Sequence, residues 1–304
     1  MIWAIAVHGG AGTWDEAHHE RAHAGVSAAA QQGGTLLAQG GSALDAVTAA
    51  VAVLEDDPLF NAGTGSVLNR DGEVEMDAAV MTGHDLRFGA VAAIRRVRNP
   101  VLVARQVIER SGHALLVGEG AVRFAREHGF GDYDPITAEA LSAFQRARAD
   151  LALGTVGAVA LDGEGRLAAA TSTGGTLLKL PGRVGDTPLP GAGTYATRDA
   201  AVSATGKGEL VMRVLAAKSI CDIGAAGVPV QHAVNRVLTA MRDTVGADAG
   251  FIAIGRDGSI GIEHGTPHMA AAWWTSEQST IVAMMQRRES PLQQSWSPSP
   301  PGRG

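Results

Sequence analysis

The high glycine content is the sequence feature that most constrains how this chain can fold. The sequence of 304 residues contains 40 glycines, whereas the usual share of about 7% would give about 21. Glycine has no Cβ atom and is favoured where a backbone turns sharply or approaches another backbone closely. Hydrophobic residues make up 45% of the chain and aromatic residues only 4%. These proportions favour a globular interior of small side chains and exclude a disordered or coiled-coil chain.

Charge and cysteine content narrow the possible partners. The formal net charge is −6, from 25 Lys and Arg against 31 Asp and Glu, so no nucleic-acid partner is expected. The single cysteine, Cys221, cannot form an internal disulfide and cannot build a cysteine-ligated zinc site. The first ten residues lack the basic segment of a signal peptide, and no apolar run reaches the ~18 residues of a membrane span. We therefore expect a cytoplasmic protein with no membrane partner.

Hydrophobic patterning and turn residues predict the secondary structure. Ser42-Ala-Leu-Asp45 is typical of a capping box and begins a helix that should end near Asp57. The segments 156–161 and 167–171 predict a β-hairpin with one face buried, joined by the turn at 162–165. The other expected elements are a strand at 2–7 running into a glycine loop at 8–12, helices at 15–32, 99–110, 118–128, 137–152, 208–223 and 230–244, and strands at 73–81, 88–97, 251–254, 259–262 and 280–284.

The order of these elements favours two packed sheets covered by helices over alternating βαβ units. No internal repeat is present. Residues 290–304 hold four prolines among serines and glutamines, and we expect them to form a disordered tail.

The segment His19-Glu20-Arg21-Ala22-His23 matches the H-E-x-x-H pattern. On a helix, two such histidines can bind zinc while the glutamate acts as a base. The flanking residues are small or polar, as on the exposed face of a surface helix, and Ala29 stands where an extended form of the motif has a third histidine. A surface helix is the favoured interpretation. A zinc hydrolase that uses His19 and His23 remains an alternative.

The sequence Leu153-Gly154-Thr155-Val156 leads into a buried strand. Its simplest interpretation is a turn before that strand. It also suits a chain that cleaves itself, because a cut before Thr155 would free an α-amine beside the threonine hydroxyl. Such an amine has an unperturbed pKa of about 7.7–8.0 and can serve as the base that a hydroxyl nucleophile needs. Gly154 would tolerate the strained backbone of that cleavage.

Six further segments stand in a fixed order around this point: HGGAG at 8–12, PLFNAGTGSVL at 58–68, EMDA at 75–78, TSTGG at 171–175, KLPGRVGDTPLPGAGTY at 179–195 and SATGKGE at 203–209. Together with Gly154-Thr155 they resemble the plant-type L-asparaginase/isoaspartyl peptidase family of N-terminal-nucleophile hydrolases. The resemblance extends from His8 to about Trp273 and is interrupted mainly at 110–150.

This resemblance implies an α+β fold, the four-layer αββα sandwich of the N-terminal-nucleophile hydrolases. It implies self-cleavage between Gly154 and Thr155, which would give an α subunit, 1–154, and a β subunit, 155–304, within one folded unit. The resemblance also implies a homodimer of αβ units.

The resemblance also implies roles for individual residues. Thr155 would be the nucleophile and Thr173 the hydroxyl beside it, with Asn61 at the same end of the site. Thr205 and Gly206 would stabilise the oxyanion. The residues implied to hold the substrate are Arg183 for its α-carboxylate, Asp186 for its α-ammonium, and Gly208 through a backbone carbonyl near that ammonium, beside Thr205 and Gly206.

No cofactor is implied as a requirement. One loop resembles a structural sodium site made of backbone carbonyls, here those of Leu54, Glu55, Asp57, Phe60, Ala62 and Thr64. The loop at 8–12 is implied to lie near the scissile bond.

The implied reactions are hydrolysis of L-asparagine to aspartate and ammonia, and of isoaspartyl (β-aspartyl) dipeptides to aspartate and an amino acid. A glycosylasparaginase-like enzyme or a threonine endopeptidase relative is an alternative of the same class. The first is normally secreted or lysosomal and contains disulfides, which the single cysteine argues against. The chain differs from the best-known members at Thr194, Ala204 and Lys207, and the segment before Thr155 is more apolar than usual.

Overall fold

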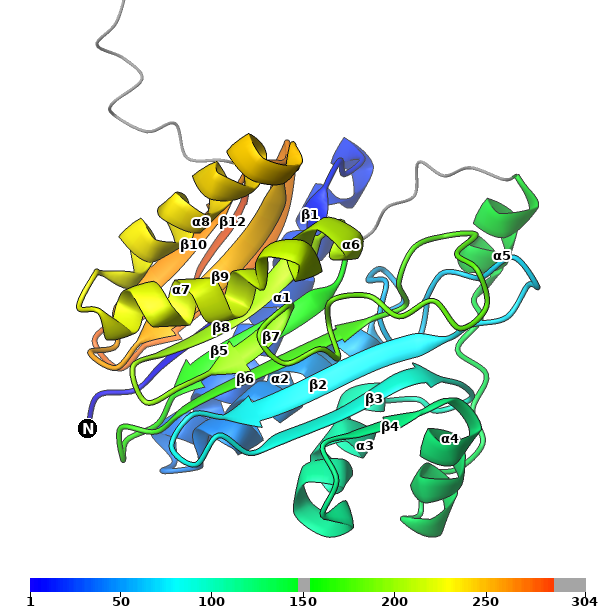
Figure 1. Cartoon of the computed structure of the whole chain (residues 1–304), viewed down its shortest axis with the longest axis horizontal. Helices are drawn as coiled ribbons and strands as arrows, with labels where there is room; N and C mark the ends of the chain where they lie inside the picture. The colour runs from blue at the N-terminus through cyan, green and yellow to red at the C-terminus, as the bar shows by residue number, and fades with distance from the viewer. Residues whose placement is uncertain (147–153, 287–304) are drawn as a thin grey trace, which may run out of the picture.

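The computed structural model describes residues 1–146 and 154–286. Within them the chain forms two β-sheets packed face to face, with helices on both outer surfaces (Figure 1). These four layers confirm the α+β sandwich that the resemblance implied. The expected tail at 290–304 lies outside the described residues.

The larger sheet contains the central strands of the molecule. Its strand order is β12-β11-β1-β5-β6-β2-β3-β4, with β3 and β4 parallel and the other neighbours antiparallel. The hairpin of β5 and β6 therefore lies in the middle, between β1 and β2. The strands are β1 (Ala4–Gly12), β2 (Met76–Thr82), β3 (Phe88–Ile94), β4 (Leu115–Val117), β5 (Val156–Leu161), β6 (Leu167–Thr173), β11 (His268–Thr275) and β12 (Val282–Gln286).

The smaller sheet is antiparallel throughout, in the order β10-β9-β8-β7. Its strands are β7 (Thr194–Ala196), β8 (Ala200–Gly206), β9 (Ala249–Gly255) and β10 (Ile260–His264). Two helices, α7 (Ala216–Ala225) and α8 (Val230–Val245), cover its outer face on the viewer's side of Figure 1. The short helix α6 (Gly208–Val211) follows β8 directly.

The remaining helices belong to the larger sheet. Two of them, α1 (His19–Ala38) and α2 (Ala43–Asp56), contact β1, β5 and β11 on the face behind the sheets in Figure 1. Helix α3 (Pro100–Gln106) packs on β2 and β3, and α4 (Gly118–Glu127) on β3. Helix α5 (Ala138–Gln145) is the last element before residue 147. Ser42 caps α2 as expected, because its side chain accepts a hydrogen bond from the backbone N–H of Asp45.

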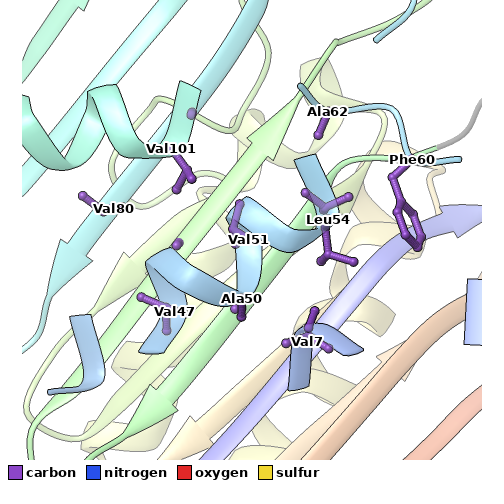
Figure 2. Close-up of a cluster of buried hydrophobic side chains, with 14 of the residues drawn as sticks. Val7, Val47, Ala50, Val51, Leu54, Phe60, Ala62, Val80 and Val101 are labelled. Atoms are coloured by element: carbon purple, nitrogen blue, oxygen red, sulfur yellow. The ribbon is translucent and has the colours of Figure 1, made fainter. Parts of the chain in front are cut away.

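Small apolar side chains fill all three interfaces between the layers. Under α1, α2 and α3 the core includes Val51, Leu54 and Phe60 (Figure 2). Between the sheets it is built largely from alanine, with isoleucine, leucine and methionine, and under α7 and α8 it includes Phe251. Every residue of β5 and β6 is buried. The hairpin is therefore buried on both faces, not on one as the sequence suggested, because a sheet lies on one side of it and helices on the other.

Three expectations from the sequence were wrong in detail. The expected glycine loop at 8–12 is part of β1, which pairs with β11 as far as Gly12 after an irregularity beyond His8. The helix expected at 208–223 is interrupted, because Leu215 adopts a left-handed conformation with φ of 47°. The helix expected at 15–32 begins at His19 and ends at Ala38. Strands β4, β7, β8 and β11 were not predicted. The part of the 137–152 helix from residue 147 onward lies outside the described residues.

The close packing of α1 against α2 depends on a helical glycine. A Cβ atom on Gly33 would lie 2.8 Å from the carbonyl oxygen of Ala46 and would overlap the side chain of Ile5. Alanine normally stabilises a helix by about 1 kcal/mol over glycine, but overpacking typically costs about 1–3 kcal/mol.

We therefore expect Gly33→Ala to lower the free energy of unfolding, measured by urea denaturation. The matched control is Gly120→Ala in α4, where a Cβ atom meets nothing within 4 Å, and this variant should be as stable as the wild type or more so. Equal effects of the two substitutions would contradict the close-packing explanation.

Candidate active site

A pocket of about 570 Å³ opens where the ends of β5, β6 and β8 meet. It brings together residues from both sheets and from the loops that follow β6 and β8. Most of the residues singled out in the sequence line it: Gly154, Thr155, Thr173, Arg183, Asp186, Gly206 and Gly208. The strand order explains this gathering, because β6 ends beside the start of β5.

Thr155 immediately precedes β5 and is 7% exposed. Its hydroxyl donates a hydrogen bond to Oγ1 of Thr173, over 3.1 Å. The same Thr173 oxygen accepts a hydrogen bond from the backbone N–H of Gly175, over 3.0 Å. The two hydroxyls expected to lie together therefore do so, and the turn after β6 fixes the second one.

Asn61 supports this turn from the opposite side. Its Nδ2 donates to the carbonyl of Gly175 at 2.7 Å, and its own carbonyl accepts the N–H of Gly174 at 2.8 Å. Its Oδ1 accepts the backbone N–H of Val67 at 3.0 Å. Asn61 thus acts on the site through the 173–175 turn, and within the described part of the chain no hydrogen bond joins it to Thr155.

Thr205 and Gly206 end β8. Gly206 lines the pocket, whereas Thr205 is fully buried behind it and is not among the lining residues. Oγ1 of Thr205 accepts the backbone N–H of Ala11 over 3.2 Å, which leaves its own hydroxyl proton free to donate. A Cβ atom on Gly10 would lie 2.6 Å from Cα of Gly154. Only glycine permits this contact between the two backbones, so β1 lies against the residue just before Thr155, as the resemblance implied.

Arg183 and Asp186 lie together on the loop before β7. Arg183 makes a two-pronged ion pair with Glu209, through Nε and Nη2 at 2.9 Å each. Asp186 is buried, and burial raises the pKa of its carboxyl to about 7. Its Oδ2 has no hydrogen-bond partner among the described residues, and a Cβ atom on Gly208 would lie 2.7 Å from its Oδ1. The loop therefore presents a guanidinium and a carboxyl group to the same pocket.

A chain of buried polar side chains joins the two sheets next to the pocket. Nε2 of His8 lies 2.9 Å from the hydroxyl of Ser203, which lies 2.8 Å from that of Thr171. Thr194 donates to Thr171 at 2.7 Å. Burial lowers the pKa of His8 to about 3, so its ring is neutral. No role for these four residues followed from the sequence, although a polar residue within an otherwise apolar strand is a usable signal.

The loop after α2 contains the expected sodium ligands. The backbone N–H of Thr64 donates to the carbonyl of Glu55 over 2.8 Å, and that of Phe60 donates to the carbonyl of Asp57 over 3.1 Å. Gly63 has a φ of 57°, and a Cβ atom there would collide with the carbonyl of Glu55. These contacts close the loop back onto the end of α2.

The H-E-x-x-H segment has a different environment. His19 begins α1, and its ring packs 4.8 Å from the ring of His268, whereas the side chain of His23 is exposed. Across residues 1–146 and 154–286 no three His, Cys, Asp or Glu side chains gather closely enough to hold a metal. This arrangement is that of a surface helix and gives the zinc alternative no support.

The four-layer sandwich, with its pocket at the ends of the central strands, is the fold of the N-terminal-nucleophile hydrolases. Within that class the chain belongs to the asparaginase family, whose model matches residues 1–284. Members of this family use an N-terminal threonine as nucleophile.

Several characterised relatives are similar over most of the chain. A plant-type L-asparaginase of Pyrococcus horikoshii is 46% identical over 89% of this chain and 95% of its own length. An isoaspartyl peptidase of Escherichia coli is 44% identical over 88% of this chain and 92% of its own. An isoaspartyl peptidase/L-asparaginase of Bos taurus is 44% identical over 85% and 89%. None of the helices in the described part of the chain has the length and apolar character to cross a membrane.

Proposed function

We propose that this chain is a self-cleaving threonine amidohydrolase that acts on L-asparagine and on isoaspartyl dipeptides. Relatives named for both activities are 44–46% identical to it over most of its length. The observation that carries the proposal is the position of Thr155, at the head of a central strand, hydrogen-bonded to Thr173 and facing a pocket that holds Arg183 and Asp186. A glycosylasparaginase-like or endopeptidase activity stays an alternative, to be tested with those substrates.

Cleavage between Gly154 and Thr155 would supply the missing base. In the intact chain the nitrogen of Thr155 is an amide and cannot accept a proton, whereas after cleavage it is an α-amine beside the hydroxyl. The amine takes the proton of the hydroxyl as Oγ1 attacks the side-chain carbonyl of the substrate. The hydroxyl of Thr205 and the N–H of Gly206 stabilise the oxyanion. Ammonia or an amino acid leaves with a proton, and water then releases aspartate from the ester with Thr155.

The pocket supports recognition of the aspartyl group through two opposite charges. A guanidinium pairs with a planar carboxylate, so Arg183 would bind the α-carboxylate, which must then share this side chain with Glu209. The carboxylate of Asp186 would bind the α-ammonium of the substrate, beside the backbone carbonyl of Gly208. We further propose a homodimer of αβ units, which size-exclusion chromatography would test.

Self-cleavage predicts two fragments of 154 and 150 residues on a denaturing gel. Thr155→Ala should remain one band at 31.2 kDa and lose about 10³-fold or more of its hydrolytic rate, because the nucleophile is absent. The matched control is Thr176→Ala, an exposed threonine on the same pocket, which should cleave and turn over like the wild type. A Thr155→Ala protein that is cleaved and active would refute the assignment. Loss of activity with a chelator would instead favour a zinc enzyme.

The pKa of Asp186 predicts a pH dependence of ligand binding. Its pKa of about 7 lies above the ordinary value for aspartate, so as pH falls below 7 a growing fraction of the carboxyl is neutral and cannot pair with an ammonium. The affinity of the cleaved enzyme for the product L-aspartate, measured by calorimetry from pH 8 to pH 5.5, should weaken by about tenfold per unit below pH 7.

Succinate is the matched control ligand, because it has the two carboxylates of aspartate without the ammonium. Its affinity should fall much less over the same range, and only near pH 5.5, where its own second carboxyl group begins to protonate. Parallel pH profiles for the two ligands would show that Asp186 does not contact the ammonium.

We also propose that the loop at 54–64 holds a structural sodium ion through its backbone carbonyls. The fit rests on the donor set, because hard cations prefer oxygen ligands and a carbonyl that accepts one N–H keeps a second lone pair. The carbonyls of Glu55 and Asp57 are of this kind. The others would be those of Leu54, Phe60, Ala62 and Thr64. Such an ion would stiffen the loop that carries Asn61.

Sodium should therefore raise the melting temperature in a saturable manner, because a ligand that binds only the folded state stabilises it. Choline chloride at equal ionic strength is the control and should leave the melting temperature lower. Superimposable melting curves in the two salts would contradict a sodium site.

A further inference from the structure

Lys179 is a buried lysine in the pocket wall to which the mechanism above gives no role. It is 6% exposed, and it lines the same pocket as Thr155 and Thr173. An ammonium group loses much of its hydration on burial, so it is retained only where its hydrogen bonds are made. Its surroundings therefore indicate what it does.

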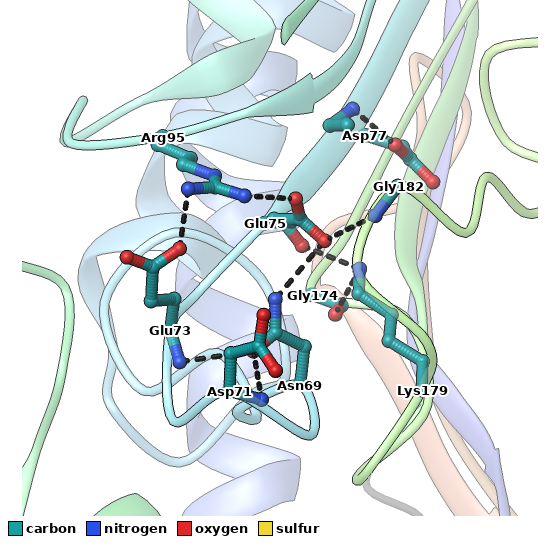
Figure 3. A network of polar contacts seen from close by, with 10 residues as sticks. Asn69, Asp71, Glu73, Glu75, Asp77, Arg95, Gly174, Lys179 and Gly182 are labelled. Atoms are coloured by element: carbon teal, nitrogen blue, oxygen red, sulfur yellow. Dashed lines mark hydrogen bonds and ion pairs between the residues drawn. The ribbon is translucent and has the colours of Figure 1, made fainter.

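The ammonium group of Lys179 holds two backbone carbonyls from opposite halves of the chain (Figure 3). Its Nζ donates to the carbonyl of Glu75 over 2.6 Å and to that of Gly174 over 3.0 Å. A Cβ atom on Gly175, whose φ is 78°, would lie 2.7 Å from Nζ. A side chain at position 175 would therefore displace the ammonium from the turn.

The anchor at Glu75 is itself firmly held. Its carboxylate accepts hydrogen bonds from Arg95 at 2.6 Å, from the backbone of Gly182 at 2.9 Å and from Asn69 at 3.1 Å. The nearby carboxylate of Asp77 binds the backbone N–H of Gly185 and provides an opposite charge for Lys179. The ammonium thus joins a fixed point at the start of β2 to the turn after β6.

This turn leads directly to the proposed nucleophile. The carbonyl of Gly174 and the N–H of Gly175 belong to one peptide unit. That N–H donates to the hydroxyl oxygen of Thr173 at 3.0 Å, and the same oxygen accepts the hydroxyl of Thr155 at 3.1 Å. A cation bound to the carbonyl end of a peptide orients it and strengthens the N–H at the other end as a donor.

We propose that Lys179 is a positioning residue for the nucleophile: its ammonium fixes the Gly174–Gly175 peptide, and this peptide fixes the Thr173 hydroxyl against Thr155. The inference rests on the proposed function, because it assumes that Thr155 is the nucleophile. Asn61 binds the neighbouring groups of the same turn, so the turn is held from both halves of the chain.

The test compares three variants of the cleaved enzyme by steady-state hydrolysis of L-asparagine and by melting temperature. Lys179→Met keeps most of the volume and removes both hydrogen bonds, so kcat should fall by about tenfold or more, while KM changes much less. Lys179→Arg keeps a cation with several donors and should recover part of that loss. Arg105→Met is the matched control, because it removes a partly buried cation that pairs with Asp45 and Glu109 away from the pocket, and it should lower the melting temperature with kcat nearly unchanged.

A wild-type kcat in Lys179→Met would overturn the inference. Equal kcat losses in Lys179→Met and Arg105→Met would do the same, because they would reflect general loosening. If neither Lys179→Met nor Lys179→Arg accumulates as folded protein, Lys179 serves folding and the inference is also overturned. An inactive wild type would overturn the proposed function and the inference with it, whereas an active wild type with an unimpaired Lys179→Met would overturn the inference alone.

Discussion

The position of the two sheets relative to each other depends on a buried hydrogen-bond chain that runs from His8 through Ser203 and Thr171 to Thr194. These residues come from β1, β8, β6 and β7, and all four are inaccessible to water. Apolar contacts between alanines and valines are non-directional and tolerate sliding of one sheet over the other. Hydrogen bonds between buried groups do not, because a shift would leave each of them without a partner. Thr205 lies two residues beyond Ser203, and Thr173 two residues beyond Thr171, so the chain also sets the two sides of the pocket.

Glycine residues allow the other close contacts around the pocket, between two backbones or between a backbone and a charged side chain. At Gly10 and Gly154 two backbones touch, and at Gly208 the backbone comes close to Asp186. At Gly175 the turn leaves room for the ammonium of Lys179. The unusual glycine content is therefore concentrated in part around one pocket, where the backbone itself forms the walls. Of the charged groups, Arg183 is held by the carboxylate of Glu209 in α6, and Lys179 by the backbone carbonyls of Glu75 and Gly174.

The sequence predicted those secondary-structure elements that depend on residues close together along the chain. The capping residue Ser42 and the buried hairpin after Thr155 were recognised from neighbours along the chain, and both are present. Strand β8 was missed because it is buried on both faces and its sequence does not alternate between apolar and polar residues. The helix break at Leu215 was missed because no glycine or proline marks it in the sequence. The pocket residues were found through a resemblance of ordered motifs. The partners that hold them, such as Glu209, Glu75 and Ser203, depend on contacts between distant segments, which no local pattern encodes.

The strand order of the larger sheet bears on the order in which folding and the proposed cleavage could occur. Strand β1, from before Gly154, lies between β11 and β5, which both come after it, and β6 is followed by β2 from the first half again. Strands of the two polypeptides produced by the proposed cleavage would thus alternate within one sheet. Neither could complete the larger sheet alone, and separating them would break three strand pairings, β11 with β1, β1 with β5 and β6 with β2, and leave their backbone groups unpaired. If the proposed cleavage takes place, folding would therefore have to precede it, and the cleaved protein would have a topology that its separated pieces have no direct route to rebuild.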